Sequence, residues 1–186
     1  MDAVQSYLSQ APALKRIDDL LQVHKILFCS YSRLLATIWV RSERGRYQGQ
    51  SPMPEHLVGS CTTFNEGLKL YKEHQPTFVI CTQLLEEGSG LELVRRIKEI
   101  DPHIPTLLFL QHANQPLFYE AVGTHSDGIV LESEVGSGHV IEALRRVSDG
   151  GLYLEPVIAK AIAGSQKSQN PRLTIRELEV MQLVVC

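Results

Sequence analysis

The sequence of 186 residues has no excess of positive charge, no long apolar run and no secretory leader. Its 18 Lys and Arg residues face 21 Asp and Glu residues, a net charge of −3, so the chain as a whole is not built to coat nucleic acid. No segment approaches the roughly 18 unbroken apolar residues of a membrane helix. The N-terminus lacks the charged and apolar regions of a signal peptide. We therefore expect a cytoplasmic protein without a membrane partner.

Cysteines are too few and too scattered for a disulfide-stapled scaffold or a zinc site. The four are Cys29, Cys61, Cys81 and Cys186; they show no CxxC spacing, and no histidine stands beside them at ligand spacing. The sequence also shows no paired nucleophile and base. The glycines at Gly88 and Gly90 mark the start of a helix and are too few for a nucleotide-binding loop. These features predict a protein that is not an enzyme and holds no metal or other cofactor.

What the sequence does contain is a regular alternation of short apolar runs and helical patterns. The runs are predicted to be strands and cover residues 25–29, 56–59, 77–81, 106–110 and 128–131. Capping boxes at Thr63–Glu66 and Ser89–Glu92 predict the starts of two of the intervening helices. Apolar strands that alternate with helices indicate a doubly wound α/β fold with a five-stranded parallel sheet. The functional crevice of such a fold lies at the carboxyl ends of its strands.

The segments around this pattern divide the chain into four predicted parts: an N-terminal helical extension (1–23), the α/β domain (24–150), a helix and linker (151–172) and the start of a further helix (173–186). The extension carries an apolar stripe, which consists of Leu14, Ile17, Leu20 and Leu21. This stripe packs either on the domain itself or on a second copy of the chain, and we expect a homodimer. The loop at 42–55 is long for a compact domain, and its role is left open.

The order of these elements resembles a response regulator of the NarL/LuxR type. The stretch PTFVICTQLLEEGSGLELVRRIKEIDPHIPTLLFL resembles the third strand, third helix and fourth strand of a receiver domain, and HSDGIVLESEV resembles its closing strand. LTIRELEVMQLVV resembles the opening of a LuxR-type helix-turn-helix. The resemblance implies the flavodoxin-like strand order 2-1-3-4-5. It also implies that DNA would be bound only through an output domain of which this chain holds the first helix.

The chemistry of that family rests on five positions, and the sequence departs from the pattern at each one. Cys29 and Ser30 stand where two acids would help to hold Mg²⁺, and Thr82 stands where an aspartate would accept the phosphoryl group. Leu110 replaces a Thr or Ser, and Glu132 replaces a Lys. These changes remove the metal ligands, the nucleophile and the charge clamp together. The resemblance therefore implies a degenerate receiver, or pseudo-receiver.

The leading hypothesis is an atypical, phosphorylation-independent response regulator, in which this domain senses a signal or dimerises on behalf of a DNA-binding transcription regulator. The alternatives are a protein–protein interaction module without DNA binding, a sensor of a small ligand in the uncharged crevice, and a redox sensor. The redox alternative rests on Cys29 and Cys61, which the implied strand order places near the ends of neighbouring strands. Buried cysteines more often pack as small hydrophobes. Glu86 and Glu87, in the loop after Thr82, either imitate the missing carboxylates or are solvated loop residues, and we favour the second interpretation.

Overall fold

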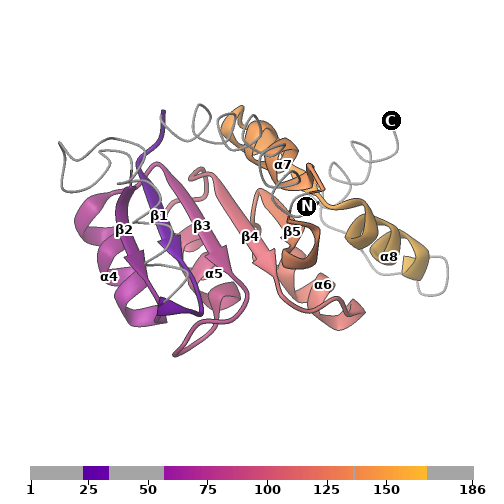
Figure 1. Ribbon diagram of the computed structural model, residues 1–186, viewed down its shortest axis with the longest axis horizontal. Coiled ribbons are helices and arrows are strands. Elements are labelled where there is room, and N and C mark those ends of the chain that lie inside the picture. Colours follow the sequence, from indigo (N-terminus) through magenta and orange to yellow (C-terminus); the bar gives the residue numbers. More distant parts are fainter. Residues whose placement is uncertain (1–22, 34–56, 136, 167–186) are drawn as a thin grey trace, which may run out of the picture.

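The computed structural model describes residues 23–33, 57–135 and 137–166, and the fold is given for these residues. A parallel sheet runs through the domain in the order β2-β1-β3-β4-β5-β6 (Figure 1). Its strands are β1 (Ile26–Cys29), β2 (Leu57–Cys61), β3 (Phe78–Thr82), β4 (Thr106–Leu110), β5 (Gly128–Leu131) and β6 (Tyr153–Leu154). The doubly wound fold and the order 2-1-3-4-5 are confirmed. The sheet has one strand more than predicted, because the short β6 pairs with β5 at its edge.

Helices cover both faces of the sheet. They are α4 (Phe64–His74), α5 (Gly90–Ile100), α6 (Gln115–Val122), α7 (His139–Ser148) and α8 (Pro156–Gln166), and a 3₁₀ turn, η1 (Glu132–Glu134), follows β5. In the described part, α4, α5, α6 and α8 pack on one face and α7 on the other (Figure 1). No helix in this part has the length and apolar character needed to cross a membrane.

Helix starts follow the predicted capping residues. The Thr63 hydroxyl accepts a hydrogen bond from the Glu66 N–H (3.3 Å) at the start of α4. The Ser89 hydroxyl accepts from the Glu92 N–H (3.5 Å) at the start of α5. Each bond satisfies a backbone donor that has no partner inside its helix, which fixes where the helix begins.

Strand β3 shows why the apolar runs form the centre of the sheet. Its five residues are all buried. Val79 and Cys81 belong to the core beneath α4 and α5, whereas Phe78 and Ile80 belong to the core beneath α7. Since successive side chains of a strand point to opposite faces, a strand covered on both faces has no polar alternation.

A buried ion pair holds the amino-terminal edge of β4 and β5. Lys98 Nζ, on α5, lies 2.5 Å from Asp127 Oδ2 and donates to the carbonyl oxygens of Ile104 (2.7 Å) and Pro102 (3.3 Å). The Asp127 carboxylate also accepts from the Thr106 N–H (2.9 Å) and hydroxyl (3.0 Å). The two charged side chains are only 4% and 14% exposed. These bonds therefore fix the amino-terminal ends of β4 and β5 to the end of α5. The carboxyl ends of the strands lie at the opposite side of the sheet.

Several predictions concern residues outside the described part of the chain. They are the N-terminal extension with its stripe Leu14, Ile17, Leu20 and Leu21, the loop 42–55, the linker beyond residue 166 and the helix start at 173–186. These remain predictions.

Candidate functional site at the carboxyl edge of the sheet

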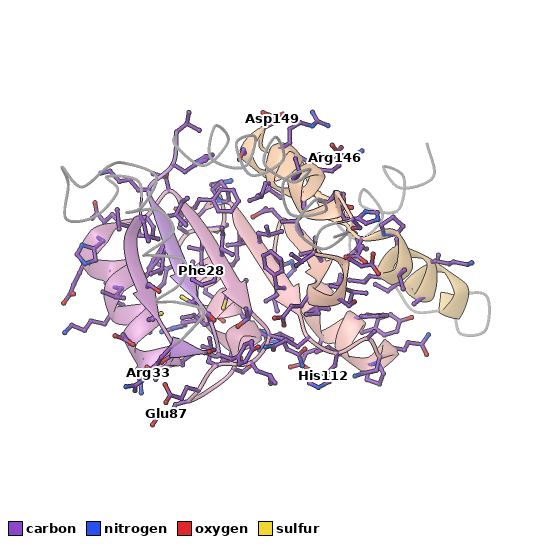
Figure 2. All side chains as sticks on the ribbon, viewed as in Figure 1. Phe28, Arg33, Glu87, His112, Arg146 and Asp149 are labelled. Carbon is purple, nitrogen blue, oxygen red and sulfur yellow. The ribbon has the colours of Figure 1, made fainter. Side chains whose placement is uncertain are left out.

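The candidate site lies where β1 and β3 end. In the order β2-β1-β3-β4-β5, the chain reverses its direction of travel across the sheet at β1 and β3, and ligands of such folds bind outside the strand ends at this point. Figure 2 shows Arg33, Glu87 and His112 at the end of the domain where these strands end, at the bottom of the view. Arg146 and Asp149 lie at the other end of the domain, at the top.

Thr82, at the phosphoacceptor position, uses its hydroxyl as a structural link. It is the last residue of β3 and is buried. Its Oγ1 accepts from the Tyr31 N–H (3.1 Å) and donates to the Leu84 carbonyl oxygen (2.7 Å). The hydroxyl proton is thus given to a carbonyl and not to a basic side chain. A hydroxyl without a general base or a metal is a weak nucleophile.

The loop after β3 bridges over the end of β1 to reach the loop after β2. The Glu86 N–H donates to the Thr62 carbonyl oxygen (2.8 Å), and the Phe64 N–H donates to the Glu87 carbonyl oxygen (2.9 Å). Thr63 and Glu87 form an isolated parallel bridge. Since β1 separates β2 from β3 in the sheet, these bonds join the two loops that flank the end of β1. The backbone of the two loops is therefore tied together at the carboxyl edge.

Side chains reinforce this bridge. The Glu86 carboxylate accepts from the Thr62 hydroxyl (2.7 Å) and from Arg33 Nε (2.9 Å). The hydrogen bond from Thr62, together with that from Arg33, lowers the pKa of Glu86, so the carboxylate is ionised at neutral pH. Glu86 is an exposed loop residue, as interpreted from the sequence, but its carboxylate is engaged. No pattern in the sequence singled out Thr62 or Arg33.

Cys29 and Ser30, at the predicted acid-pair positions, have different surroundings. Cys29 lies in register with Cys81, one residue before Thr82, and belongs to the hydrophobic core. Ser30 follows β1 and is fully buried, and its hydroxyl accepts from the Ser32 N–H (3.3 Å). Neither side chain offers the carboxylate oxygen that a hard cation prefers. Within the described ranges, no group of three or more His, Cys, Asp or Glu side chains is arranged to hold a metal ion.

Leu110 and Glu132 supply neither a hydroxyl nor a cation to this edge. Leu110 is buried in the core at the end of β4, and Glu132 begins η1 directly after β5. Amide groups join the ends of β3 and β4 instead. Gln83 Oε1 accepts from the Gln111 N–H (3.0 Å), and Gln111 Oε1 accepts from the Leu84 N–H (2.9 Å). Sequence reasoning missed both glutamines, although each directly follows a strand.

The structure brings the predicted redox pair into contact. Cys61 on β2 lies in register with Cys29 on β1, and the Cys61 thiol donates to the Cys29 sulfur at 3.1 Å. Both thiols are free and buried. The hydrogen bond to Cys29, together with burial, raises the pKa of Cys61 well above its ordinary value. Since the thiolate is the reactive form, this position disfavours thiol chemistry although the two sulfurs are close.

Three curated relatives are regulatory or signalling proteins by name. The methanol utilization control regulatory protein MoxX of Paracoccus denitrificans is 25% identical over 133 residues, which is 68% of this chain and 59% of the relative. The transcriptional activator protein ExaE of Pseudomonas putida is 30% identical over 144 residues, or 74% of this chain and 65% of the relative. The chemotaxis protein CheY of Thermotoga maritima is 26% identical over 92 residues, half of this chain (50%) and 76% of the relative. No protein-family model matches the chain.

Solved structures share the fold at lower identity. A two-component response regulator of the LuxR family from Aurantimonas sp. SI85-9A1 has a TM-score of 0.63 at 20% identity and covers 78% of this chain and 99% of its own. The isolated REC domain of RcsB from Salmonella enterica serovar Typhimurium has a TM-score of 0.57 at 14% identity and covers 73% and 96%. The chain spans less than two thirds of the MoxX and ExaE sequences (59% and 65%). It has the fold of a response-regulator receiver domain, and its curated relatives are regulatory proteins.

Proposed function

We propose that this chain is the receiver-like part of a transcription regulator that acts without phosphorylation of its pocket. The observation that carries the proposal is the state of Thr82. Its hydroxyl accepts a backbone N–H and donates to a backbone carbonyl, with no base beside it in the described part of the chain. Further hydrogen bonds of the chain engage polar groups of the loops at this edge.

Electrostatics supports the same conclusion. Phosphoryl transfer needs cations to neutralise the charge that spreads over the transferring group. The lysine position holds Glu132, which adds negative charge there. The Arg33 guanidinium already donates to the Glu86 carboxylate. An incoming phosphoryl group would have to compete for this cation, and neither Cys29 nor Ser30 supplies a carboxylate that would hold Mg²⁺ for it.

The regulatory part of the proposal rests on the relatives and on the end of the sequence. ExaE is named as a transcriptional activator and MoxX as a control regulatory protein. Residues 173–186 resemble the start of a LuxR-type helix-turn-helix, which would place DNA binding in an output domain attached there. RcsB is described in one solved structure as dimers bound to DNA. By analogy, we propose that this chain is part of a homodimeric, cytoplasmic regulator without catalytic activity.

The test is exposure to phosphoryl donors. The chain is incubated with acetyl phosphate and Mg²⁺, and separately with beryllofluoride and Mg²⁺, alongside a receiver domain that is known to respond. Intact-mass spectrometry and amide NMR spectra of this chain should remain unchanged, because the pocket offers neither nucleophile nor metal site. A phosphoryl adduct on Thr82, or beryllofluoride shifts confined to the ends of β1, β3 and β4, would refute the proposal.

A gain-of-function variant tests whether the residues at the family positions, and not the fold, account for the missing response to phosphoryl donors. We expect Thr82→Asp alone to stay unresponsive, because a single carboxylate leaves the cation without further ligands. The combined variant Ser30→Asp, Thr82→Asp, Leu110→Thr and Glu132→Lys restores an acid at the end of β1, the phosphoacceptor, the hydroxyl and the cation. Cys29 is left unchanged in this variant because it is buried in the core. Mg²⁺-dependent beryllofluoride shifts in this variant alone would support the assignment of the lost chemistry to these positions.

A further inference from the structure

Glu155 is a buried carboxyl group with one oxygen that has no hydrogen-bond partner. It lies between β6 and α8 and is 1% exposed. Its Oε2 accepts from the Leu131 N–H at 2.6 Å. Its Oε1 is buried and unpaired in the described part of the chain. A buried ionised carboxylate with half of its acceptors unused is unfavourable, whereas the neutral acid is much less so.

The position of Glu155 explains why the side chain is buried there. The Glu155 N–H donates to the Ile129 carbonyl oxygen and so continues the ladder between β5 and β6. Its own carbonyl oxygen accepts from the Ala159 N–H and has therefore become part of α8. The Leu131 N–H at the end of β5 needs another acceptor, and the Glu155 carboxyl group supplies it. This one side chain thus joins the end of β5 to the first turn of α8.

Few groups around Glu155 favour its charge. Glu134 on η1 is a negative neighbour and His139 on α7 is the opposing titratable group. His139 Nδ1 lies 2.8 Å from the hydroxyl of Tyr153 on β6, so the ring is already engaged. Pro156, the first residue of α8, has no N–H to offer. Burial is the main cause that raises the pKa of Glu155, with Glu134 adding to it and the Leu131 N–H and His139 opposing it.

We propose that Glu155 is a proton-binding group that sets how firmly α8 is attached to the sheet. When Glu155 is neutral, Oε2 keeps the bond from Leu131 as a carbonyl oxygen and α8 stays in place. When it is ionised, the unpaired oxygen requires water, which can reach it only if the start of α8 moves away from β5.

The sign of the pH dependence follows from linkage. The folded form binds the proton more tightly than the unfolded chain, whose carboxyl group has its ordinary value of 4.5. Attachment of α8 is therefore strongest at low pH and is lost as the pH rises through the raised pKa. Between the ordinary value of 4.5 and the raised pKa, the equilibrium constant for opening of α8 increases by up to about tenfold for each pH unit.

Two measurements test the proposal. In the first, ¹³C-carboxyl NMR follows the titration of glutamates in the wild-type chain, with Glu155→Gln used to assign the signal. Glu155 should titrate above its ordinary value, and Glu134→Gln should move its midpoint down. In the second, hydrogen exchange of the Leu131 amide and of α8 is measured between about pH 5 and pH 8 and corrected for intrinsic rates. Protection should fall with pH in the wild type and stay level in Glu155→Gln.

The matched control is Glu120→Gln, which removes an exposed carboxylate from α6, the helix joined to α8 by the bond from Gln115 to the Ala161 carbonyl oxygen. This variant should keep the wild-type pH dependence. The proposal is overturned if Glu155 titrates at or below its ordinary value. It is equally overturned if Glu155→Gln retains the fall in α8 protection. Should Glu155→Gln fail to fold, the midpoint shift caused by Glu134→Gln in the wild-type background assigns the signal and decides the question.

Discussion

Removing one partner of the buried Lys98–Asp127 pair should cost the fold a large part of its stability. Breaking such a pair leaves a buried charge uncompensated and costs about 3–5 kcal/mol. In Lys98→Met, Asp127 keeps the Thr106 N–H and hydroxyl as donors and is 14% exposed, so we expect about 3 kcal/mol. In Asp127→Asn, the ammonium of Lys98 is 4% exposed and loses its paired carboxylate, so we expect about 4–5 kcal/mol.

Urea unfolding followed by circular dichroism measures both losses. A small domain has an m-value of about 1–3 kcal/mol/M in urea, so a loss of about 3 kcal/mol lowers the midpoint by about 1.5 M at an m-value of about 2. This is a substantial share of the roughly 5–15 kcal/mol that stabilises a typical domain. Met has nearly the same helix propensity as Lys, so the change at Lys98 does not weaken α5 by itself.

The control lies on the same helix. Arg96 and Glu99 form an ion pair at 2.6 Å in which the side chains are 55% and 54% exposed. Arg96→Met should therefore lower stability by less than about 1 kcal/mol, since water and salt screen exposed pairs. The reasoning would be wrong if Lys98→Met shifted the midpoint no further than Arg96→Met, because burial would then not decide the energy.

Two further results are expected. A Cβ at Gly90 would lie 1.8 Å from the carbonyl oxygen at the end of β3, so Gly90→Ala should lower the thermal midpoint by about 10 °C or more. Gly123→Ala is the control and should change the midpoint little, because the nearest neighbours of its Cβ would be at 3.4 Å. Equal midpoints for the two variants would contradict the close approach at Gly90. With Cys186→Ser in place, Cys29 and Cys61 should react with a disulfide reagent only after unfolding, because both thiols are buried and neutral in the folded protein. Rapid labelling of Cys29 or Cys61 in the folded protein would instead favour the redox alternative.

The sequence was sufficient for the fold because the relevant signals are local. Apolar runs separated by helical patterns located β1 to β5, and the capping residues Thr63 and Ser89 located two helix starts. Strand β6 was not counted in the predicted sheet because it has only two residues, too few for a periodicity. The proximity of Cys29 and Cys61 could be anticipated because the strand order implied by the family resemblance places β1 beside β2, with both residues near the carboxyl ends of these strands.

The contacts of the candidate site could not be predicted in the same way. Arg33 and Glu86 are 53 residues apart and both exposed, and no pattern in the sequence links them. The bond from the Tyr31 N–H to Thr82 depends on the exact path of the loop after β1. The sequence could show which chemistry was absent from the family's five positions. It could not show which polar groups of the loops pair with one another, because that depends on three-dimensional loop geometry.

The end of β5 lies beside both Glu132 and the start of α8. Glu132, at the position where the family resemblance implies a lysine that contacts a phosphoryl group, directly follows Leu131, whose N–H is bound by Glu155. A change at the end of β5 therefore reaches the first turn of α8 through one hydrogen bond. This connection does not involve Thr82. A proton on Glu155 acts at the same place in the fold, from the side of α8, and needs no group from the pocket.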